Sequence, residues 1–268
     1  MLKDITLGQY FPIDSPIHKI DPRVKIISAV IFIVAIFMCK GLVSFALAIS
    51  FNFVIIMLSR IRFRIVLNSL KPVLFIIIFT GIINIFLTNG ETIVFKYKFI
   101  KITSEGINSA LIMTIRIVLL VTYTSLLTFT TSPILLTDGI ESLLKPFSKF
   151  GLPSHELAMM MTIALRFIPT LFEETDKIIM AQKSRGADFE SGNLIRRAKA
   201  LIPILVPLFI SSFRRADELA TAMECRCYRG SENRTRLKEL HLEQIDFISS
   251  LIVVFASASI IFLGVIGK

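Results

Sequence analysis

Five long apolar segments are the feature that most constrains what this chain can fold into. They lie at residues 24–39, 42–59, 65–87, 107–129 and 246–266. The hydrocarbon core of a bilayer is about 30 Å thick, and a helix of roughly 20 apolar residues crosses it. A helix also bonds its backbone polar groups internally, as lipid requires. With a hydrophobic content of 54% and a mean hydropathy of +0.73, these segments predict an all-α integral membrane protein with about five transmembrane helices.

The positions of Lys and Arg indicate which side of the membrane each loop occupies. The net charge is +10, and the cytoplasmic loops of membrane proteins are enriched in Lys and Arg. Cations precede the first segment and follow the second, so we predict a cytoplasmic N-terminus. This distribution gives little support to nucleic-acid binding. The cations are Lys19, Arg23, Lys25, Arg60, Arg62, Arg64 and Lys71.

The connection at 88–106 is predicted to lie outside the cell, because three crossings precede it. Lys96, Lys98 and Lys101 run against this assignment under the positive-inside bias. Apolar and polar residues alternate over 94–100, which predicts a small exposed β-hairpin.

Two further apolar stretches, 157–172 and 201–213, are poor candidates for transmembrane helices. The first contains Arg166 and Pro169, and the second contains two prolines and falls short of the roughly 20 residues needed. If the first crossed, the Lys and Arg residues between 177 and 199 would face outside, against the positive-inside bias. Both stretches therefore predict long helices at the cytoplasmic face.

Helical periodicity sets the bounds of these two helices at about 155–185 and 193–227. One face of the first helix is apolar at three- and four-residue steps, and its opposite face becomes charged from Glu173 onward. The predicted domains are residues 1–130, with an N-terminal lead-in and the first four transmembrane helices, 131–245, a cytoplasmic or interfacial helical domain, and 246–268, the last transmembrane helix.

Both long helices end on an arginine. A cation at a helix C-terminus is an ordinary feature worth roughly 0.3–1 kcal/mol, so either end alone has a simple structural explanation. Two such ends with similar flanking sequences favour a docking role. Arg can hold a carboxylate through two parallel hydrogen bonds, so an acidic pocket on a soluble partner is the natural complement. The residues concerned are Ser184, Arg185 and Gly186 in one helix and Cys225, Arg226 and Cys227 in the other.

An active site is hard to assemble from this sequence. It contains no G-x-x-x-x-G-K-[ST] loop, no G-x-S-x-G motif and no dense carboxylate cluster, and its three histidines stand apart. Cys225 and Cys227 are predicted to be reduced thiols, and a lone Cys-x-Cys is weak support for zinc. We expect no metal, no cofactor and no enzymatic activity. Arg116 lies inside the fourth segment, where a charge is costly, and we favour a pairing role for it over a place in a transport pathway.

The chain resembles the transmembrane T component of the energy-coupling factor (ECF) transporters. Four segments carry this resemblance: Ser15 to Lys25, Leu157 to Pro169, Ala181 to Phe189 and Ala222 to Tyr228. Together they are highly specific, although each alone is not. The family has two signatures that usually read Ala-Arg-Gly. Here they read Ser-Arg-Gly and Cys-Arg-Cys, so the arginines are kept and the flanking residues depart.

The resemblance implies a membrane scaffold in a prokaryotic vitamin or metal-ion uptake complex. The arginine-ended helices would dock two ABC-type ATPases and transmit their motion to a small membrane-embedded substrate-binding subunit. Asp21 and Arg23 match a family Asp-x-Arg motif, which we interpret as a local ion pair or a helix cap, and Arg166 and Pro169 fall in a family segment. The chain itself would bind neither ATP nor substrate.

Two other functional classes remain open at this point. A stand-alone secondary transporter would need a polar pathway at the bilayer midplane, and a membrane-embedded enzyme would need a convergent catalytic set. The sequence shows neither clearly. Nor does it indicate which vitamin or metal ion is carried, whether the two ATPases are identical, or whether several binding subunits share this scaffold.

Overall fold

The structure is a computed structural model that describes residues 10–88, 92–97, 100–151, 153–189, 193–230 and 240–266. The first nine residues of the predicted lead-in, and Lys98 of the predicted hairpin, lie outside these ranges. The described chain packs as two compact units. The transmembrane unit comprises residues 10–142 and 240–266, and the α8–α9 unit comprises the described residues of 143–230.

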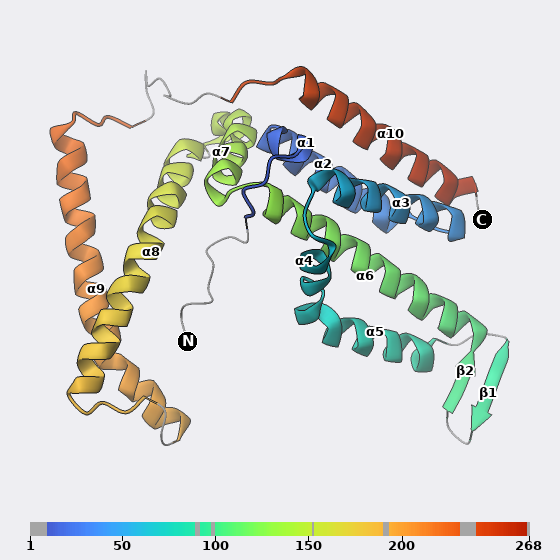
Figure 1. Cartoon of the computed structure of the whole chain (residues 1–268), viewed down its shortest axis with the longest axis horizontal. Coiled ribbons are helices and arrows are strands. Elements are labelled where there is room, and N and C mark those ends of the chain that lie inside the picture. Colours follow the sequence, from blue (N-terminus) through green and yellow to red (C-terminus); the bar gives the residue numbers. More distant parts are fainter. Residues whose placement is uncertain are drawn as a thin grey trace. The chain divides into compact units, whose positions relative to one another are not determined.

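Helices dominate the transmembrane unit (Figure 1). In the described ranges, four helical stretches are long and apolar enough to cross a membrane: Leu42–Ser59, Phe63–Leu87, Ser104–Thr130 and Gln244–Val265. The predicted all-α membrane fold is thereby confirmed. The elements are α1 (Pro16–Lys19), α2 (Pro22–Met38), α3 (Leu42–Ser59), α4 (Phe63–Asn68), η1 (Lys71–Val73), α5 (Leu74–Leu87), β1 (Ile93–Tyr97), β2 (Ile100–Thr103), α6 (Ser104–Thr130), α7 (Pro133–Leu144) and α10 (Gln244–Ile266).

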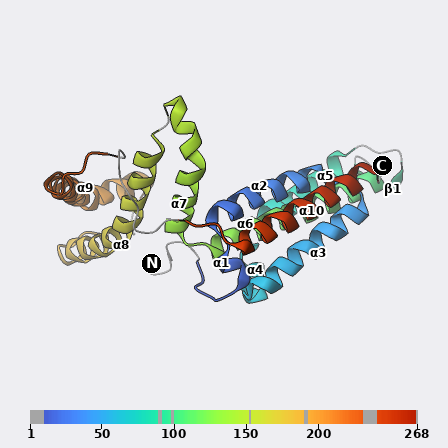
Figure 2. The same cartoon turned by 90° about the horizontal axis from the view of Figure 1, so that it is seen from above.

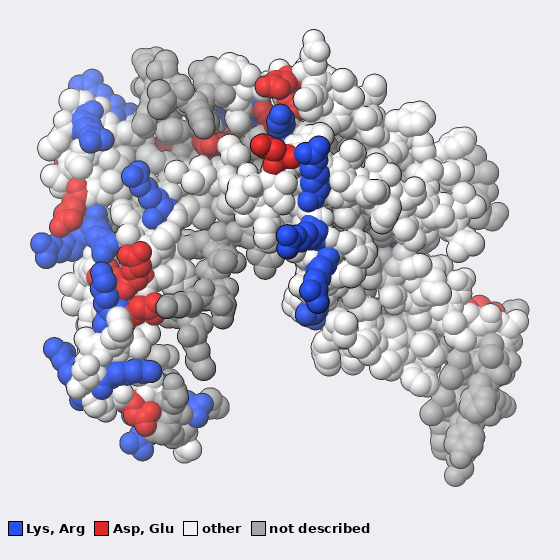
Figure 3. Space-filling model, viewed as in Figure 1, with Lys and Arg blue, Asp and Glu red and all other residues white. Residues whose placement is uncertain are grey.

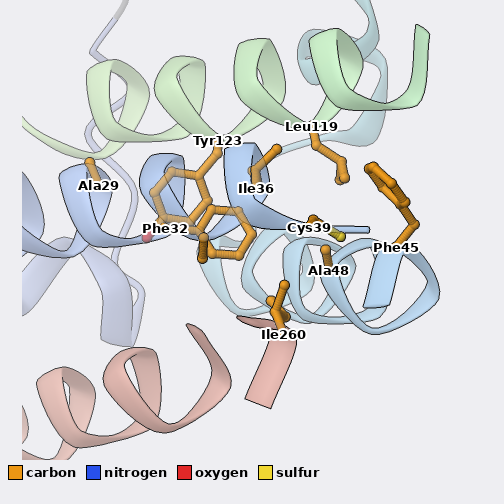
Figure 4. Packing of buried hydrophobic residues seen from close by; sticks show 10 residues of the cluster. Ala29, Phe32, Ile36, Cys39, Phe45, Ala48, Leu119, Tyr123 and Ile260 are labelled. Atoms are coloured by element: carbon orange, nitrogen blue, oxygen red, sulfur yellow. The ribbon is translucent and has the colours of Figure 1, made fainter. Parts of the chain in front are cut away.

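One face of α2 contributes to the main buried cluster of this unit. Its Phe32 and Ile36 are fully buried against side chains from α3, α6 and α10, as Figure 4 shows. The ring of Phe32 lies 4.3 Å, centroid to centroid, from the ring of Tyr123 on α6. Small side chains in this cluster allow the helices to approach closely. Its other buried members are Ala29, Ala35, Cys39, Phe45, Ala48, Leu119 and Ile260.

α10 packs beside α2 along the whole length of that helix (Figure 2). At the start of α2, the Asp21 amide donates a hydrogen bond of 2.7 Å to Oδ1 of Asp246. Beyond its end, α10 comes so close that a Cβ on Gly264 would lie 3.0 Å from the Lys40 nitrogen. α2 has 17 residues, which is about 25 Å of helix. Because α10 contacts the chain at both ends of α2, the two helices extend over the same part of the bundle.

The predicted helix at 65–87 is interrupted in the structure. α4 ends at Asn68, a 3₁₀ turn follows at Lys71–Val73, and α5 begins at Leu74. Pro72 explains the break, because it has no N–H to continue the helical hydrogen bonds and its ring crowds the preceding turn. The stretch still counts as one candidate span by its length and hydropathy.

The predicted hairpin is confirmed in the connection between α5 and α6. β1 and β2 pair antiparallel, with Lys96 opposite Lys101. Thr103 follows as the N-cap of α6, and its hydroxyl accepts a hydrogen bond of 3.2 Å from the Gly106 amide.

Much of the surface of the transmembrane unit is apolar. Phe75 on α5 and Leu251 and Phe255 on α10 are each more than two-thirds exposed. On the face that Figure 3 shows, few charged side chains lie over α5 and α10. A soluble protein seldom exposes so large an apolar area, whereas lipid-facing helices do so by necessity.

The α8–α9 unit contains η2 (Lys145–Phe150), α8 (Ser154–Ser184) and α9 (Leu194–Cys225). The two long helices predicted at 155–185 and 193–227 are confirmed. Both continue through internal prolines, Pro169 in α8 and Pro203 and Pro207 in α9. Neither helix is among the candidate membrane spans found in the described residues.

Polar contacts join α8 to α9 in an antiparallel pair. Glu174 of α8 accepts a hydrogen bond from the Ser211 hydroxyl and pairs with Arg215 of α9 at 2.5 Å. Further toward the end of α8, Gln182 Nε2 donates a hydrogen bond of 3.4 Å to the Pro203 carbonyl. The order of these contacts shows that the residues of α9 run backwards past those of α8.

Candidate functional site

The C-terminal end of α8 is a helix stop built around Arg185. Arg185 is the C-cap, with φ −87° and ψ 5°, and Gly186 follows with φ +85°. The Gly186 amide bonds the Lys183 carbonyl at 3.0 Å, and the Ala187 amide bonds the Gln182 carbonyl at 3.0 Å. These two bonds define a Schellman motif. Apart from its two chain neighbours, no described residue lies within 4 Å of a Cβ built on Gly186, so the positive φ, not a lack of space, favours glycine here.

The end of α9 repeats this geometry around Arg226. Arg226 is the C-cap, with φ −90° and ψ 13°. The Cys227 amide bonds the Glu224 carbonyl at 2.8 Å, and the Tyr228 amide bonds the Met223 carbonyl at 3.0 Å. Cys227 takes the left-handed conformation with φ 56°, which costs a non-glycine residue roughly 1–2 kcal/mol. The near-repeat in the sequence is therefore also a repeat in structure.

Both arginine ends are open to solvent. All six residues that the sequence analysis selected at these ends are exposed. Within the described residues, neither Arg185 nor Arg226 has a side-chain hydrogen bond or an ion pair. Cys225 and Cys227 are free, exposed thiols. Each guanidinium is thus free to bind a carboxylate from another molecule.

The two arginines lie at opposite ends of the helix pair. Figure 1 shows α8 and α9 running in opposite directions, so that their C-terminal ends point away from each other. The helices contain 31 and 32 residues, and each would be roughly 45 Å long if straight. The structure therefore presents two separate sites of the same local geometry.

A second group of predicted residues lies at the start of α2. Asp21 is the N-cap of that helix, and its Oδ1 accepts a hydrogen bond of 2.8 Å from the Arg23 amide. The Arg23 side chain returns to the same carboxylate, with Nη2 2.9 Å from Oδ2 and Nε 3.0 Å from Oδ1. The predicted local ion pair is present, and the predicted cap is present beside it.

Arg23 also binds two groups that are distant in sequence. Its Nη2 donates a hydrogen bond of 2.9 Å to the Leu240 carbonyl, and its Nη1 lies 3.4 Å from the Ser142 hydroxyl. Asp246 accepts the Asp21 amide on Oδ1 and the Glu243 amide, at 2.8 Å, on Oδ2. One small cluster therefore joins the start of α2, the end of α7 and the start of α10.

Arg116 has partners within the transmembrane unit. Its Nη2 donates a hydrogen bond of 3.1 Å to the carbonyl of Cys39, the C-cap residue of α2. Its guanidinium also lies 5.8 Å from the centre of the Phe45 ring. A cation at a helix C-terminus satisfies a carbonyl that has no helical partner and interacts favourably with the helix dipole. These contacts agree with the pairing role favoured from the sequence.

Arg166 and Pro169 lie one turn apart on α8, and both are exposed. They are at least fifteen residues before Arg185 on the same helix, so the structure does not bring them into the helix-end site. Among the described residues, no cluster of three or more His, Cys, Asp or Glu side chains could hold a metal ion.

Sequence reasoning missed several members of the cluster at the start of α2. Asp246 carried a usable signal, because an acidic residue in the first turn of a helix is a common N-terminal feature. α7 was also recognisable, since Ser132 and Pro133 form a helix-start pair and the Ser132 hydroxyl accepts a bond from the Leu135 amide. The contribution of the Leu240 carbonyl had no signal, because any residue supplies the same group.

The fold defines the class of multi-span α-helical membrane proteins. A model of the family described as cobalt transport protein, CbiQ, matches residues 14–237. A protein of Clostridium kluyveri described as energy-coupling factor transporter transmembrane protein EcfT is 59% identical over 252 residues, covering 94% of this chain and 93% of its own. A protein with the same description from Ruminiclostridium cellulolyticum is 56% identical, over 95% of this chain and 96% of its own length. Another, from Acidaminococcus fermentans, is 54% identical, over 94% of this chain and 94% of its own length.

The chain therefore belongs to the EcfT family, the transmembrane proteins of energy-coupling factor transporters. It is a transmembrane component of such a transporter in a prokaryotic membrane.

Proposed function

We propose that this chain is the scaffold of an ECF transporter and docks two ABC-type ATPases, one at each arginine-ended helix. The observation that carries the proposal is the repeated helix end, in which Arg185 and Arg226 occupy the same C-cap position and are exposed and unpaired within the described residues. An acidic pocket on each ATPase would receive the guanidinium. The opposed directions of α8 and α9 favour two partners over one, because the ends point away from each other (Figure 1).

Motion of the two ATPases during ATP hydrolysis would then pass into α8 and α9. The ion pair between Glu174 and Arg215, and the bond from Gln182 to the Pro203 carbonyl, connect the helices along their contact. A displacement of one helix end would therefore be transmitted to the other helix. Arg166 and Pro169 lie on this path along α8, and we assign them a structural role in the coupling.

A small membrane-embedded substrate-binding subunit would pack on the apolar faces of this pair. Met160 on α8 and Phe209, Ile210 and Phe213 on α9 are each more than half exposed. Flexible Met and large aromatic side chains are common at such protein contacts. The same faces are suitable for contact with the lipid surface.

Five crossings and a cytoplasmic N-terminus complete the proposal. α2 crosses with α10, because contacts at both ends hold the two helices side by side. The crossings are then α2, α3, α4 to α5, α6 and α10, in the cell membrane of a prokaryote. The proposed domains are residues 1–130, 131–245 and 246–268.

The substrate is a vitamin or a metal ion bound by the separate subunit. The description of the matching family names cobalt, whereas the EcfT relatives carry no substrate in their descriptions. In this role the chain binds no ATP, performs no catalysis and carries no cofactor.

A stand-alone secondary transporter is the alternative, and the transmembrane unit offers it little support. Its apolar cavity of about 170 Å³ is lined mainly by aliphatic and aromatic side chains, including Phe51, Ile55 and Leu126. The Lys25 ammonium at this cavity is already bonded to the carbonyls of His18 and Thr130 and to the Thr131 hydroxyl. All three ammonium donors are thus occupied, and this site lacks a polar route for a substrate.

Co-purification tests the docking proposal. The full chain is co-expressed with the candidate ATPases of its host, and ATPase recovery is compared among the native chain, Arg185→Glu, Arg226→Glu and the double variant. Arg214→Glu is the matched control, because Arg214 is also exposed and its one ion pair among the described residues is with Glu218 on its own helix. Loss of a buried, hydrogen-bonded charge pair costs about 2–5 kcal/mol, or roughly 1.5–3.5 decades in affinity.

Recovery that falls for the two helix-end variants and persists for Arg214→Glu supports docking at these ends. Equal recovery in all variants would show that neither arginine carries the contact. If a correctly folded native chain recovers no ATPase and transports without one, the secondary-transporter alternative is correct.

A further inference from the structure

Two of the connections between the units have described residues on the transmembrane side, Ser142 and Leu240, and Arg23 contacts both of these residues. The chain leaves the transmembrane unit after Ser142, and Leu240 is the first described residue back in that unit. Nη1 of Arg23 lies 3.4 Å from the Ser142 hydroxyl, and Nη2 donates a bond of 2.9 Å to the Leu240 carbonyl. All of these atoms belong to the transmembrane unit. The Arg23 guanidinium therefore contacts both the Ser142 hydroxyl and the Leu240 carbonyl.

This guanidinium is itself fixed. Asp21 binds it through both carboxylate oxygens, and the Asp21 side chain is only 3% exposed. Asp246 holds the Asp21 amide at 2.7 Å and the Glu243 amide at 2.8 Å. The segment that returns to the unit is thus attached twice, by Arg23 at Leu240 and by Asp246 at Glu243.

α7 is held against the same point by close packing. A Cβ on Gly139 would lie 3.2 Å from Cβ of Pro22 and 3.2 Å from Cδ1 of Ile26. The absence of a side chain at Gly139 lets α7 rest directly on the first turn of α2. Ser142 lies three residues further on, on the same helix face, which brings its hydroxyl to Arg23.

We propose that Arg23 is a positioning residue that ties both connections of the α8–α9 unit to one fixed point at the start of α2. With this tie, neither connection can shift on the transmembrane unit without the other. The relevant geometry is specific to arginine. A lysine at this position is a point charge and cannot bond both oxygens of Asp21 while it reaches Ser142 and Leu240.

Lys25, the other cation of α2, cannot take over this role. Lys25 lies two residues further along α2 and is buried, but its ammonium is already bonded to His18, Thr130 and Thr131. Removal of the Arg23 guanidinium therefore leaves Ser142 and Leu240 without a common partner. The inference rests on contacts within the chain. Its consequence for transport rests on the proposed function.

Pulsed EPR distances measured on the isolated full chain in nanodiscs test the inference without any ATPase. Spin labels are placed at Arg62→Cys in the transmembrane unit and Lys177→Cys in α8, both exposed positions, with Cys225 and Cys227 replaced by Ser. A second label pair, Arg62→Cys with Lys40→Cys, lies wholly within the transmembrane unit and reports whether that unit stays folded.

Arg23→Gln is expected to widen the distribution of distances between the labels at 62 and 177 at least twofold. The distribution for the pair at 62 and 40, the inner pair, should stay unchanged. Ser142→Ala removes one attachment only and should widen it less. Arg60→Gln is the control, because Arg60 is an exposed arginine of the same unit whose one side-chain hydrogen bond to the described chain is with the Asp14 carbonyl. The control is expected to match the native chain.

An unchanged distribution in Arg23→Gln, with the inner pair intact, overturns the inference. If the distance distribution of the inner pair also widens, Arg23→Lys decides, because it keeps the positive charge and loses only the forked contacts. Widening between the units in Arg23→Lys supports the tie, and a native distribution refutes it. Because no ATPase is present, failure of the docking proposal leaves this result interpretable.

Discussion

Asp246 is the group in the transmembrane unit whose loss should be felt most clearly. Its residue is 3% exposed, and its carboxylate accepts backbone amides from two different segments, Asp21 at 2.7 Å and Glu243 at 2.8 Å. Asp246→Ala removes two charge-assisted bonds and leaves the buried Asp21 amide without an acceptor. A buried polar group left without its partner costs about 1–3 kcal/mol.

For the pair of bonds we therefore expect a loss of about 3 kcal/mol in the free energy of unfolding. In a chain of this size, each kcal/mol shifts the midpoint of thermal unfolding by roughly 2–4 °C, so the total shift is about 6–12 °C. Asp246→Asn keeps one carbonyl oxygen as an acceptor and should lose about half as much. Asp217→Ala on α9 is the control, because that side chain is exposed.

Cys39 provides the assay. It is fully buried in the core around α2, so a maleimide dye reacts with it only when the bundle opens. With Cys225 and Cys227 replaced by Ser, the rise of dye labelling with temperature gives the midpoint for each variant in detergent. If Asp246→Ala shifts the midpoint no more than Asp217→Ala does, the reasoning about the two amides is wrong.

The end of α8 and the histidine of the lead-in provide two further predictions. Gly186→Ala places a residue with a Cβ in the left-handed conformation, at a cost of roughly 1–2 kcal/mol. Hydrogen exchange at the Ala187 amide should therefore accelerate about 5- to 30-fold. An unchanged exchange rate would contradict the Schellman motif. Burial lowers the pKa of His18 below its ordinary value of 6.5. As the pH falls, the imidazole is therefore protonated in the unfolded chain before it is protonated in the folded chain. The free energy of unfolding is at its full value above pH 6.5 and falls as the pH drops below 6.5. Midpoints measured against pH should show this loss in the native chain and not in His18→Gln, and a loss of equal size in both would exclude His18 as the source.

Much of the fold could be predicted because lipid allows few solutions. The long apolar runs from 42 to 59 and from 107 to 129 became helices, since nothing else satisfies the backbone in hydrocarbon. The two long helices of the α8–α9 unit were predictable from periodicity, despite their prolines. The break at Pro72 was missed, because hydropathy averaged over a window ignores the loss of a single N–H.

The site could be predicted only where a local pattern carries it. Arg185 and Arg226 mark helix ends that can be recognised from a few neighbouring residues. Partners brought together from distant parts of the chain could not be predicted, because Arg23 meets Ser142 and Leu240 only through tertiary packing. The carbonyl that Arg116 binds was equally hidden, since every residue offers one.

The pairing of α2 with α10 has a consequence for the time order of synthesis. Asp21 and Asp246 are separated by 225 residues, so a ribosome adding 5–20 residues per second needs roughly 10–45 s to make the second after the first. Throughout that interval the first membrane helix lacks its neighbour, and the Asp21 amide lacks its acceptor. The transmembrane unit is completed only when the last helix is inserted, so a nascent chain that stops before residue 244 leaves its earliest helix exposed to quality control.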